Sequence, residues 1–423
     1  MHYRLFIMPV VFLALSLVGA DWRQWRGPGG SGLSDEKGLP TTWSAKDNLV
    51  WRAKLPGLGT SSPIVVGKRV YVTCYSGYGL GVYKKREKGE PEPEDLKDLK
   101  RHLVCIDRAN GSILWTKNFD PLLPESNYYV HEGDFHGYAS STPASDGKNL
   151  YVFFGISGIY CFDLDGKQLW REDVGKGKRN WGSSNSPVLY KDLVIVNASV
   201  ESGSIIAFDK TTGKQAWQAK GISDSWNTPV LVDAPGGTEL VVNVSGAVLG
   251  LDPANGKELW RVKANGGYVC PSVVADKDTV YAVRGGVLAI KAGGRGDVTE
   301  SNVLWKAGGG SQIPSPAYHD GRLYWVDRGG VFTCLDAADG KKVYAERVSK
   351  GGEFFASPLI ADGKVYLVSR FTGGYVIAEG PKFKELAHNA FEDDKTRTNA
   401  TPIAHEGNLL LRTDQYLYCL GKK

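Results

Sequence analysis

Hydrophobic and polar positions alternate in short runs along most of the chain, and turn residues separate the runs. β-Branched and aromatic residues fill segments such as Val70-Tyr71-Val72, Leu150-Tyr151-Val152 and Val365-Tyr366-Leu367. Asn110-Gly111 and Asp362-Gly363 are of the dipeptide type that supplies the positive φ angles of two-residue hairpin turns. The pattern predicts many short antiparallel strands and disfavours a helical bundle.

A unit of about 43 residues repeats along the chain, and each copy opens with a Ser/Thr-Pro pair or its equivalent. Only the first interval is longer, by about 37 residues. Cys270-Pro271 stands in for one pair. The other seven are Ser62-Pro63, Thr142-Pro143, Ser186-Pro187, Thr228-Pro229, Ser315-Pro316, Ser357-Pro358 and Thr401-Pro402.

Each unit holds four strands, of which the fourth carries a Trp in most copies. A lone sheet of this size cannot bury both faces, so neighbouring units must stack, and radial closure gives a β-propeller. The last unit ends at Tyr418-Cys419-Leu420 without a fourth strand, while residues 48–55 resemble an orphan fourth strand. The sequence therefore predicts an all-β, eight-bladed propeller of four-stranded antiparallel blades, closed by N- and C-terminal strands in the last blade.

The first 20 residues read as a cleavable secretory leader, because Arg4 precedes an apolar run that ends at Val18-Gly19-Ala20. We expect a leader over 1–20, an extended arm over 21–47 laid on one face, and the propeller over 48–423. Insertions are expected at about 76–101 and 119–136. Asp21 stands where a lipoprotein would carry Cys, and no later run is long enough to span a bilayer, so we expect a periplasmic or secreted protein without an anchor.

The net charge is +5, and +4 once Arg4 leaves with the leader. Because this small charge is spread over the whole chain, the sequence lacks the clustered basic residues expected of a protein that binds nucleic acid or an anionic membrane. We expect a monomer, although the sequence leaves the oligomeric state open.

A second pattern, Asp-x-x-x-Gly-Lys-x-x-Trp, stands at residues 209–217 and 252–260, with looser copies in other units. It resembles the tryptophan-docking motif of the quinoprotein (PQQ) repeat superfamily, in which the Trp of each blade packs against its neighbour. The resemblance covers roughly residues 48–421. It implies a structural docking role for Trp51, Trp115, Trp170, Trp217, Trp260 and Trp305.

This superfamily holds dehydrogenases that use PQQ and calcium, and non-catalytic BamB-like propellers. Two segments, the start of the mature chain at Asp21–Pro28 and the stretch His136–Pro143, resemble segments of BamB-like exported proteins of planctomycete-type bacteria. No vicinal Cys pair is present to close over PQQ, and the calcium ligands of the dehydrogenases cannot be placed on this chain. Cys105, Cys161, Cys334 and Cys419 occupy a column of small residues, so we expect buried free thiols.

Residues just before the innermost strands should lie at the mouth of the central channel. An aromatic and amide rim there suits a flat ligand, a sugar or a peptide, although the same loops could simply plug the channel. The candidate residues are Trp181, Asn185, Trp226, Asn227, Tyr268, Gln312, Phe354, Phe355, Arg397 and Asn399.

A polar cluster, His131, Glu132, Asp134 and His136, falls at the end of the second insertion. Two imidazoles and two carboxylates could hold zinc or iron or act as acid and base, yet the spacing matches no metal signature and an ordinary loop is the alternative.

These observations favour a non-catalytic scaffold or binding module that contacts exported or envelope proteins through blade edges and loops, with no cofactor. A PQQ- and calcium-dependent dehydrogenase of alcohols or sugars and a carbohydrate-binding propeller remain the alternatives. A small ligand or glycan could occupy the channel mouth in the binding cases.

Overall fold

The computed structural model describes residues 21–77, 96–125, 129–130, 133–134, 136–179 and 181–422. Two of the predicted polar residues, His131 and Glu132, lie outside this part of the chain. Asp134 lies in a short strand of which only the backbone is described.

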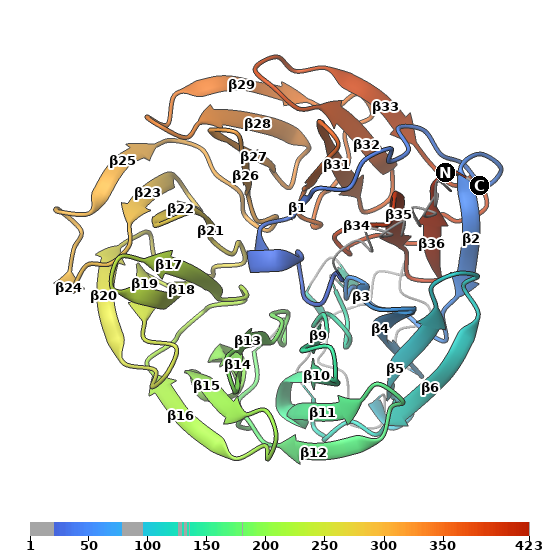
Figure 1. The fold of residues 1–423 in the computed structure, drawn as a ribbon, viewed down its shortest axis with the longest axis horizontal. Helices are drawn as coiled ribbons and strands as arrows, with labels where there is room; N and C mark the ends of the chain where they lie inside the picture. The colour runs from blue at the N-terminus through green and yellow to red at the C-terminus, as the bar shows by residue number, and fades with distance from the viewer. Residues whose placement is uncertain are drawn as a thin grey trace, which may run out of the picture.

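Eight antiparallel sheets of four strands carry the fold, and they are arranged around a central axis as blades (Figure 1). Blades 1 to 4 consist of β3 (Ile64–Val66), β4 (Arg69–Ser76), β5 (Lys100–Asp107) and β6 (Ile113–Phe119); β9 (Ala144–Ser145), β10 (Asn149–Phe153), β11 (Ile159–Asp163) and β12 (Gln168–Glu172); β13 (Val188–Tyr190), β14 (Leu193–Ala198), β15 (Ser204–Asp209) and β16 (Gln215–Lys220); and β17 (Val230–Ala234), β18 (Gly237–Val244), β19 (Ala247–Leu251) and β20 (Glu258–Lys263).

Blades 5 to 8 consist of β21 (Val274–Asp276), β22 (Thr279–Val283), β23 (Val287–Lys291) and β25 (Val303–Ala307); β26 (Ala317–His319), β27 (Arg322–Val326), β28 (Val331–Asp336) and β29 (Lys342–Arg347); β30 (Leu359–Ala361), β31 (Lys364–Ser369), β32 (Gly373–Ala378) and β33 (Glu385–Asn389); and β34 (Ile403–His405), β35 (Asn408–Arg412), β36 (Tyr416–Leu420) and β2 (Leu49–Lys54).

Short elements complete the fold. They are β1 (Leu33–Ser34), β24 (Gly296–Asp297), the pair β7 (Tyr129–Val130) and β8 (Gly133–Asp134), α1 (Ser199–Ser202), η1 (Pro28–Gly30) and η3 (Gly155–Ser157). Within the described residues, no helix has the length and apolar character needed to cross a membrane.

Blade 8 closes the ring as predicted. β2 runs antiparallel to β36, with Trp51 opposite Cys419 and Ala53 opposite Leu417. The pairing joins the two ends of the propeller and covers two sheet edges that would otherwise be exposed. The prediction of an all-β, eight-bladed propeller is confirmed.

A chain of hydrogen bonds around the inner wall links consecutive blades. In each link, the backbone N–H of one Ser or Thr donates to the hydroxyl of its counterpart in the next blade, at distances from 2.9 to 3.1 Å. We call these residues the hydroxyl belt. They are Ser62, Thr142, Ser186, Thr228, Ser272, Ser315, Ser357 and Thr401.

The belt corrects the register expected for blade 5. Ser272 takes the belt position there, because its hydroxyl accepts from Thr228 N at 3.0 Å and its N–H donates to Ser315 at 2.9 Å. Val273 follows it where the other blades have Pro. The Cys270-Pro271 pair is therefore offset by two residues, and the hydroxyl rather than the proline is the constant feature.

The docking tryptophans pack against glycines of the following blade, in the turn before its fourth strand. Trp51, Trp170 and Trp305 lie against Gly111, Gly213 and Gly340, where an added Cβ would come within 2.5–2.8 Å of the indole. The indole N–H of each donates to a carbonyl of that same turn, at 2.9–3.0 Å. Trp217 does the same at Gly256, with a hydrogen bond of 3.2 Å. Trp115 packs on Gly166, but its indole nitrogen has no hydrogen-bond partner among the described residues.

The N-terminal arm crosses one end of the channel (Figure 1). Its carbonyls at Trp22 and Arg23 accept from Val65 N and Ser145 N at 2.8 Å, and β1 pairs in parallel with β30. Arg26 is fully buried and donates to Ser31 O at 2.8 Å and to Pro316 O at 2.5 Å. The arm is therefore bound to the inner strands of several blades.

Candidate functional site

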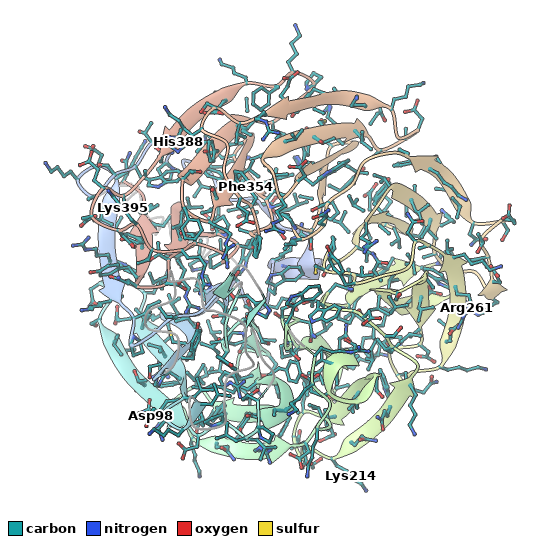
Figure 2. All side chains as sticks on the ribbon, turned by 180° about the vertical axis from the view of Figure 1, so that it is seen from behind. Asp98, Lys214, Arg261, Phe354, His388 and Lys395 are labelled. Atoms are coloured by element: carbon teal, nitrogen blue, oxygen red, sulfur yellow. The ribbon has the colours of Figure 1, made fainter. Side chains whose placement is uncertain are left out.

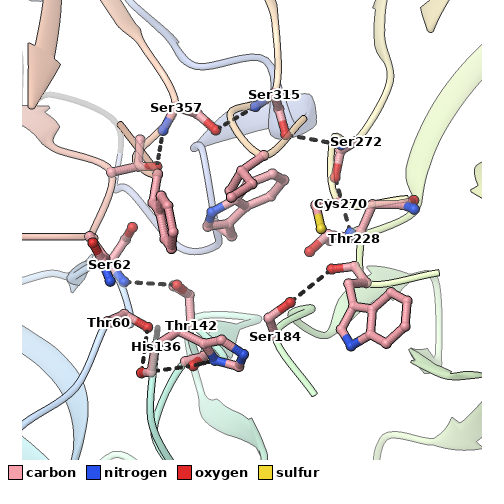
Figure 3. A pocket seen from close by; sticks show the side chains of 18 of the residues that line it. Thr60, Ser62, His136, Thr142, Ser184, Thr228, Cys270, Ser272, Ser315 and Ser357 are labelled. Carbon is pink, nitrogen blue, oxygen red and sulfur yellow. Dashed lines mark hydrogen bonds between the residues drawn. The ribbon is translucent and has the colours of Figure 1, made fainter. Parts of the chain in front are cut away.

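A central pocket of about 200 Å³ lies on the propeller axis, inside the hydroxyl belt (Figure 3). Trp25 of the arm contributes to its wall and also borders a second cavity toward the arm side. The loops that precede the innermost strands form most of the remaining lining, and Arg328 joins them from the hairpin between β27 and β28. The arm therefore closes one end of the channel, and the loops surround the other.

Three aromatic side chains form one side of this pocket, which we call the aromatic wall: Trp181, Trp226 and Tyr268. The rings of Trp181 and Trp226 are 5.3 Å apart at 66°, and those of Trp181 and Tyr268 are 4.9 Å apart at 75°. Such edge-to-face contacts hold large apolar surfaces in fixed orientations. Tyr268 keeps 37% of its surface exposed, so the wall is accessible to a ligand.

Hydrogen bonds fix the loops that carry the wall. The indole N–H of Trp226 donates to Gly182 O at 2.7 Å, and Ser184 Oγ donates to Trp226 O at 3.0 Å. Asn227 lines the pocket, but its side-chain amide is hydrogen-bonded within the blade, where Nδ2 donates to Asn243 O at 2.6 Å. Asn227 therefore positions the wall and offers less to a ligand than its neighbours do.

His136 faces the pocket from the second blade. Its Nδ1 lies 2.5 Å from Ser140 Oγ. Burial, with smaller contributions from the charges of Arg397 and Arg370, lowers the pKa of His136 to about 4. The imidazole is therefore neutral at neutral pH.

Several predicted residues do not line the pocket. Phe354 is wholly buried against Tyr375, at a centroid distance of 5.7 Å, and Figure 2 shows it inside the ring between the axis and the rim. Its neighbour Phe355 lines the pocket instead. Asn185 and Arg397 are also buried, and Arg397 pairs with Asp414 at 3.0 Å. Alternation along the loop explains these positions, since adjacent side chains point to opposite sides.

The structure brings Trp181, Trp226, Asn227, Tyr268, Gln312, Asn399 and His136 together in one pocket. Sequence reasoning missed Trp25 and Arg328. Arg328 lies in the hairpin between β27 and β28, outside the loops before the innermost strands where the sequence pattern predicts the channel mouth. No sequence signal connects Trp25 with the channel, because its neighbours in the pocket are far along the chain.

The pocket does not match a calcium site. Calcium prefers carboxylate and carbonyl oxygens, and the described lining residues include no Asp or Glu. Within the described part of the chain, no group of His, Cys, Asp and Glu side chains is arranged to hold a metal ion. All six cysteines are free thiols, so no disulfide contributes to the site.

The blades, the docking tryptophans and the central pocket define the class of PQQ-like β-propellers. The family model described as "Outer membrane protein assembly factor BamB" matches residues 100–301 and 285–416. The chain belongs to this BamB family of PQQ-like propellers. A curated relative, outer membrane protein assembly factor BamB of Yersinia pestis, is 23% identical over an alignment of 261 residues, and the match covers 56% of this chain and 63% of the relative, less than two thirds of either.

Solved structures show the same fold. BamB from Moraxella catarrhalis superimposes with a TM-score of 0.55 over 96% of this chain and 99% of that chain, at 12% identity. A europium-containing methanol dehydrogenase gives a TM-score of 0.62 over 95% of this chain and 98% of that chain, also at 12% identity. At such identities the likeness concerns the fold alone.

Proposed function

We propose that this protein is an exported, non-catalytic binding module of the cell envelope, with its recognition site in the central pocket. The observation that carries the proposal is the lining of that pocket. An accessible aromatic wall stands beside amide and hydroxyl groups, a combination typical of binding sites. The loops around the mouth and the outer blade edges would contact exported or envelope proteins.

The ionisable groups of the pocket support binding over catalysis. His136 is neutral at neutral pH, and burial raises the pKa of Cys270 to about 12, so the thiol is not a thiolate nucleophile. Arg328 is engaged with Glu353, with Nε and Oε1 2.6 Å apart. With a pKa near 4 the neutral imidazole of His136 is only a weak base, so the described lining residues offer no group whose pKa is tuned for general-base catalysis near neutral pH.

Family membership supports the same proposal, since the matching family model is named for outer membrane protein assembly. Removal of residues 1–20 as a leader and release into the periplasm or beyond belong to the proposal. The dehydrogenase alternative would need a calcium ligand set, and the described lining residues do not supply one.

The test is a binding screen of the 21–423 protein against labelled sugars and peptides, with two pocket variants. Trp181→Ala and Tyr268→Ala should each weaken the binding of every ligand that binds the wild-type protein. Leu304→Ala, at an outer-strand residue that is 54% exposed, is the matched control and should bind normally. Thermal unfolding of all variants checks that they fold.

A parallel assay adds PQQ and calcium and follows dye-linked oxidation of alcohols and sugars. We expect no turnover. Turnover, or ligand binding that is unaffected by both pocket variants, would contradict the proposal.

A further inference from the structure

A groove lies between blades 4 and 5, which are neighbours in the ring (Figure 1). Its volume is about 370 Å³, within the roughly 300–1,000 Å³ of small-molecule sites. The β22–β23 hairpin and the loop after β20 form its rim, so it opens on the face of the channel mouth and not on the arm side. We call it the interblade groove. The polar side chains of its described lining are Asn243, Lys263, Asn265, Arg284 and Lys306.

Asn243 forms a buried part of the interblade groove. Only 3% of its surface is exposed, and it stands on β18 opposite Val248, on the sheet face that packs against blade 5. Its backbone carbonyl accepts from Ser225 Oγ and Asn227 Nδ2, but its side-chain amide makes no hydrogen bond with any described residue. A buried amide without a partner costs free energy, so a ligand oxygen that accepts from this amide would satisfy it.

Arg284 is held rigidly at the rim of the groove. Its Nε donates to Tyr268 O at 2.7 Å, and its Nη1 donates to Gly266 O at 3.1 Å. The guanidinium also lies over the ring of Tyr268, 5.2 Å from the centroid. Nη2 makes no hydrogen bond within the described residues, so its donors remain for a ligand. The side chain is therefore oriented in advance by neutral groups, and no carboxylate of the described chain neutralises it.

The cations of the groove outnumber the anions beside it. Lys263 pairs with Asp297 at 3.0 Å. Arg284 and Lys306 form no ion pair in the described part of the chain, and the described lining contains no Asp or Glu. Lys306 stands opposite Leu288 in the β23–β25 pairing, so both side chains lie on the face toward the groove. Three cations and one carboxylate give a formal charge of +2.

Glycines keep the hairpin side of the groove open. Gly285 and Gly286 form the tip of the β22–β23 hairpin with φ angles of 62° and 143°, which L side chains rarely adopt. A Cβ at Gly285 would come within 3.2 Å of Asn265 Nδ2, which donates to Gly285 O at 2.8 Å. The hairpin tip therefore leaves room beside the cations.

The donor set fits a phosphate group better than a carboxylate. A phosphate monoester carries about −1.5 to −2 charges at pH 7 and three acceptor oxygens that point in different directions. It can therefore balance the charge of +2 and accept from an amide, a guanidinium and an ammonium at once. A carboxylate has one charge and two oxygens in a plane. The groove is also larger than a lone phosphate, and Ala264 and Leu288 give it an apolar part.

We propose that the interblade groove binds the phosphate group of a small phosphate ester. The phosphate accepts from Asn243, Arg284 and Lys306, and the carbon part of the ester lies on Leu288. The site is separate from the central pocket, so this inference goes beyond the proposed function. A phospholipid headgroup carries the same group, and vesicles therefore form a separate arm of the test.

The experiment is isothermal titration of the 21–423 protein with inorganic phosphate, glycerol 3-phosphate and acetate in dilute buffer. We expect glycerol 3-phosphate to bind at least as tightly as phosphate, and acetate to bind about tenfold or more weakly. The affinity for both phosphates should fall as salt rises, because the groove is open to solvent.

Two variants remove the cations one at a time. Arg284→Gln should weaken both phosphates about tenfold or more, since it removes a charged hydrogen-bond donor. Lys306→Gln, at an exposed position, should weaken them about two- to fivefold. Lys220→Gln, at an exposed lysine of the outer strand β16, is the matched control and should bind normally. Thermal unfolding checks that each variant folds.

Equal binding of phosphate and acetate, or phosphate binding that survives both groove substitutions, overturns the site. An equal loss in Lys220→Gln and Lys306→Gln would assign the effect to total charge and also overturns it. If vesicles of phosphatidylglycerol bind through Lys306 and glycerol 3-phosphate does not bind, the soluble ester is overturned. Trp181→Ala should leave phosphate binding unchanged, so this inference and the proposed function can fail independently.

Discussion

The indole N–H of Trp260 donates to Oε2 of Glu239 at 2.6 Å, and both side chains are buried. Most other docking tryptophans donate to a carbonyl of the following blade. Blade 5 has Lys291 where the motif has Asp, and its turn toward β25 is longer. Glu239 takes over the missing contact, accepts from Gly293 N at 3.1 Å and lies 3.3 Å from Arg295. A carboxylate thus replaces a backbone turn at one blade interface.

Glu239→Ala should therefore destabilise the protein by about 1–3 kcal/mol, because the indole N–H of Trp260 and Gly293 N lose a buried acceptor. Glu239→Gln keeps an acceptor oxygen and should cost less. Urea unfolding measures both. Equal loss in the two variants would show that the charge, through Arg295, matters more than the hydrogen bond.

Glu201 should make stability depend on pH. Burial, with a smaller contribution from the nearby charge of Glu125, raises its pKa to about 7. The folded state therefore binds the proton more tightly than the unfolded chain, whose value is 4.5. Stability should fall as pH rises from about 4.5 to about 7, by up to ~3 kcal/mol from this group.

Glu201→Gln mimics the protonated acid and tests this expectation. Ser183 Oγ, which donates to Glu201, keeps an acceptor oxygen in the variant. The variant should be more stable than the wild type at pH 8 and similar at pH 4.5, as measured by urea unfolding. Glu258→Gln, at an exposed position of β20, is the control and should show no such difference. A constant gap across the pH range would refute the assigned pKa.

Removing the closing strand should open the ring. Deletion of residues 48–55 leaves β36 without its partner and exposes an unpaired edge. We expect a lower melting temperature and self-association in light scattering after size-exclusion chromatography. Deletion of 416–423 should have the same effect. A truncated protein that stays monomeric and equally stable would contradict the closure.

The thiols should be unreactive in the native protein. Five of the six cysteines are buried, and desolvation raises the pKa of Cys270 to about 12 although it borders the pocket. A thiol reagent at pH 8 should therefore detect six thiols in urea and almost none in buffer. Rapid labelling of Cys270 in buffer would show that the pocket activates it.

The sequence was sufficient for the architecture because the repeat places one strand pattern in every blade. It predicted the pairing of residues near Trp51 with those near Cys419. It misplaced the start of blade 5 by two residues, because Cys270-Pro271 was aligned with the Ser/Thr-Pro pairs of the other blades. The residue that takes the belt position is Ser272, whose hydroxyl accepts the hydrogen bond. The hydrogen bonds between blades do not require the proline that follows the hydroxyl residue in the other seven units, so the spacing of the prolines could not locate the belt position in blade 5.

The site was predicted in part. Trp181, Trp226, Tyr268 and Gln312 lie in the pocket because each stands in a loop before an innermost strand. Phe354 and Phe355 are adjacent aromatics, and only the backbone direction decides which of them faces the axis. Arg328 and Trp25 enter from a hairpin and from the arm, and their proximity to the pocket depends on tertiary structure.

The most direct test of the account follows the indole N–H signals of the ¹⁵N-labelled protein during titration with a ligand found in the screen of sugars and peptides. A ligand in the central pocket should shift the signals of Trp181 and Trp226 and leave those of Trp217 and Trp305, at the outer blade interfaces, unchanged. Shifts confined to the outer indoles, or unchanged Trp181 and Trp226 signals while calorimetry shows binding, would contradict a central recognition site.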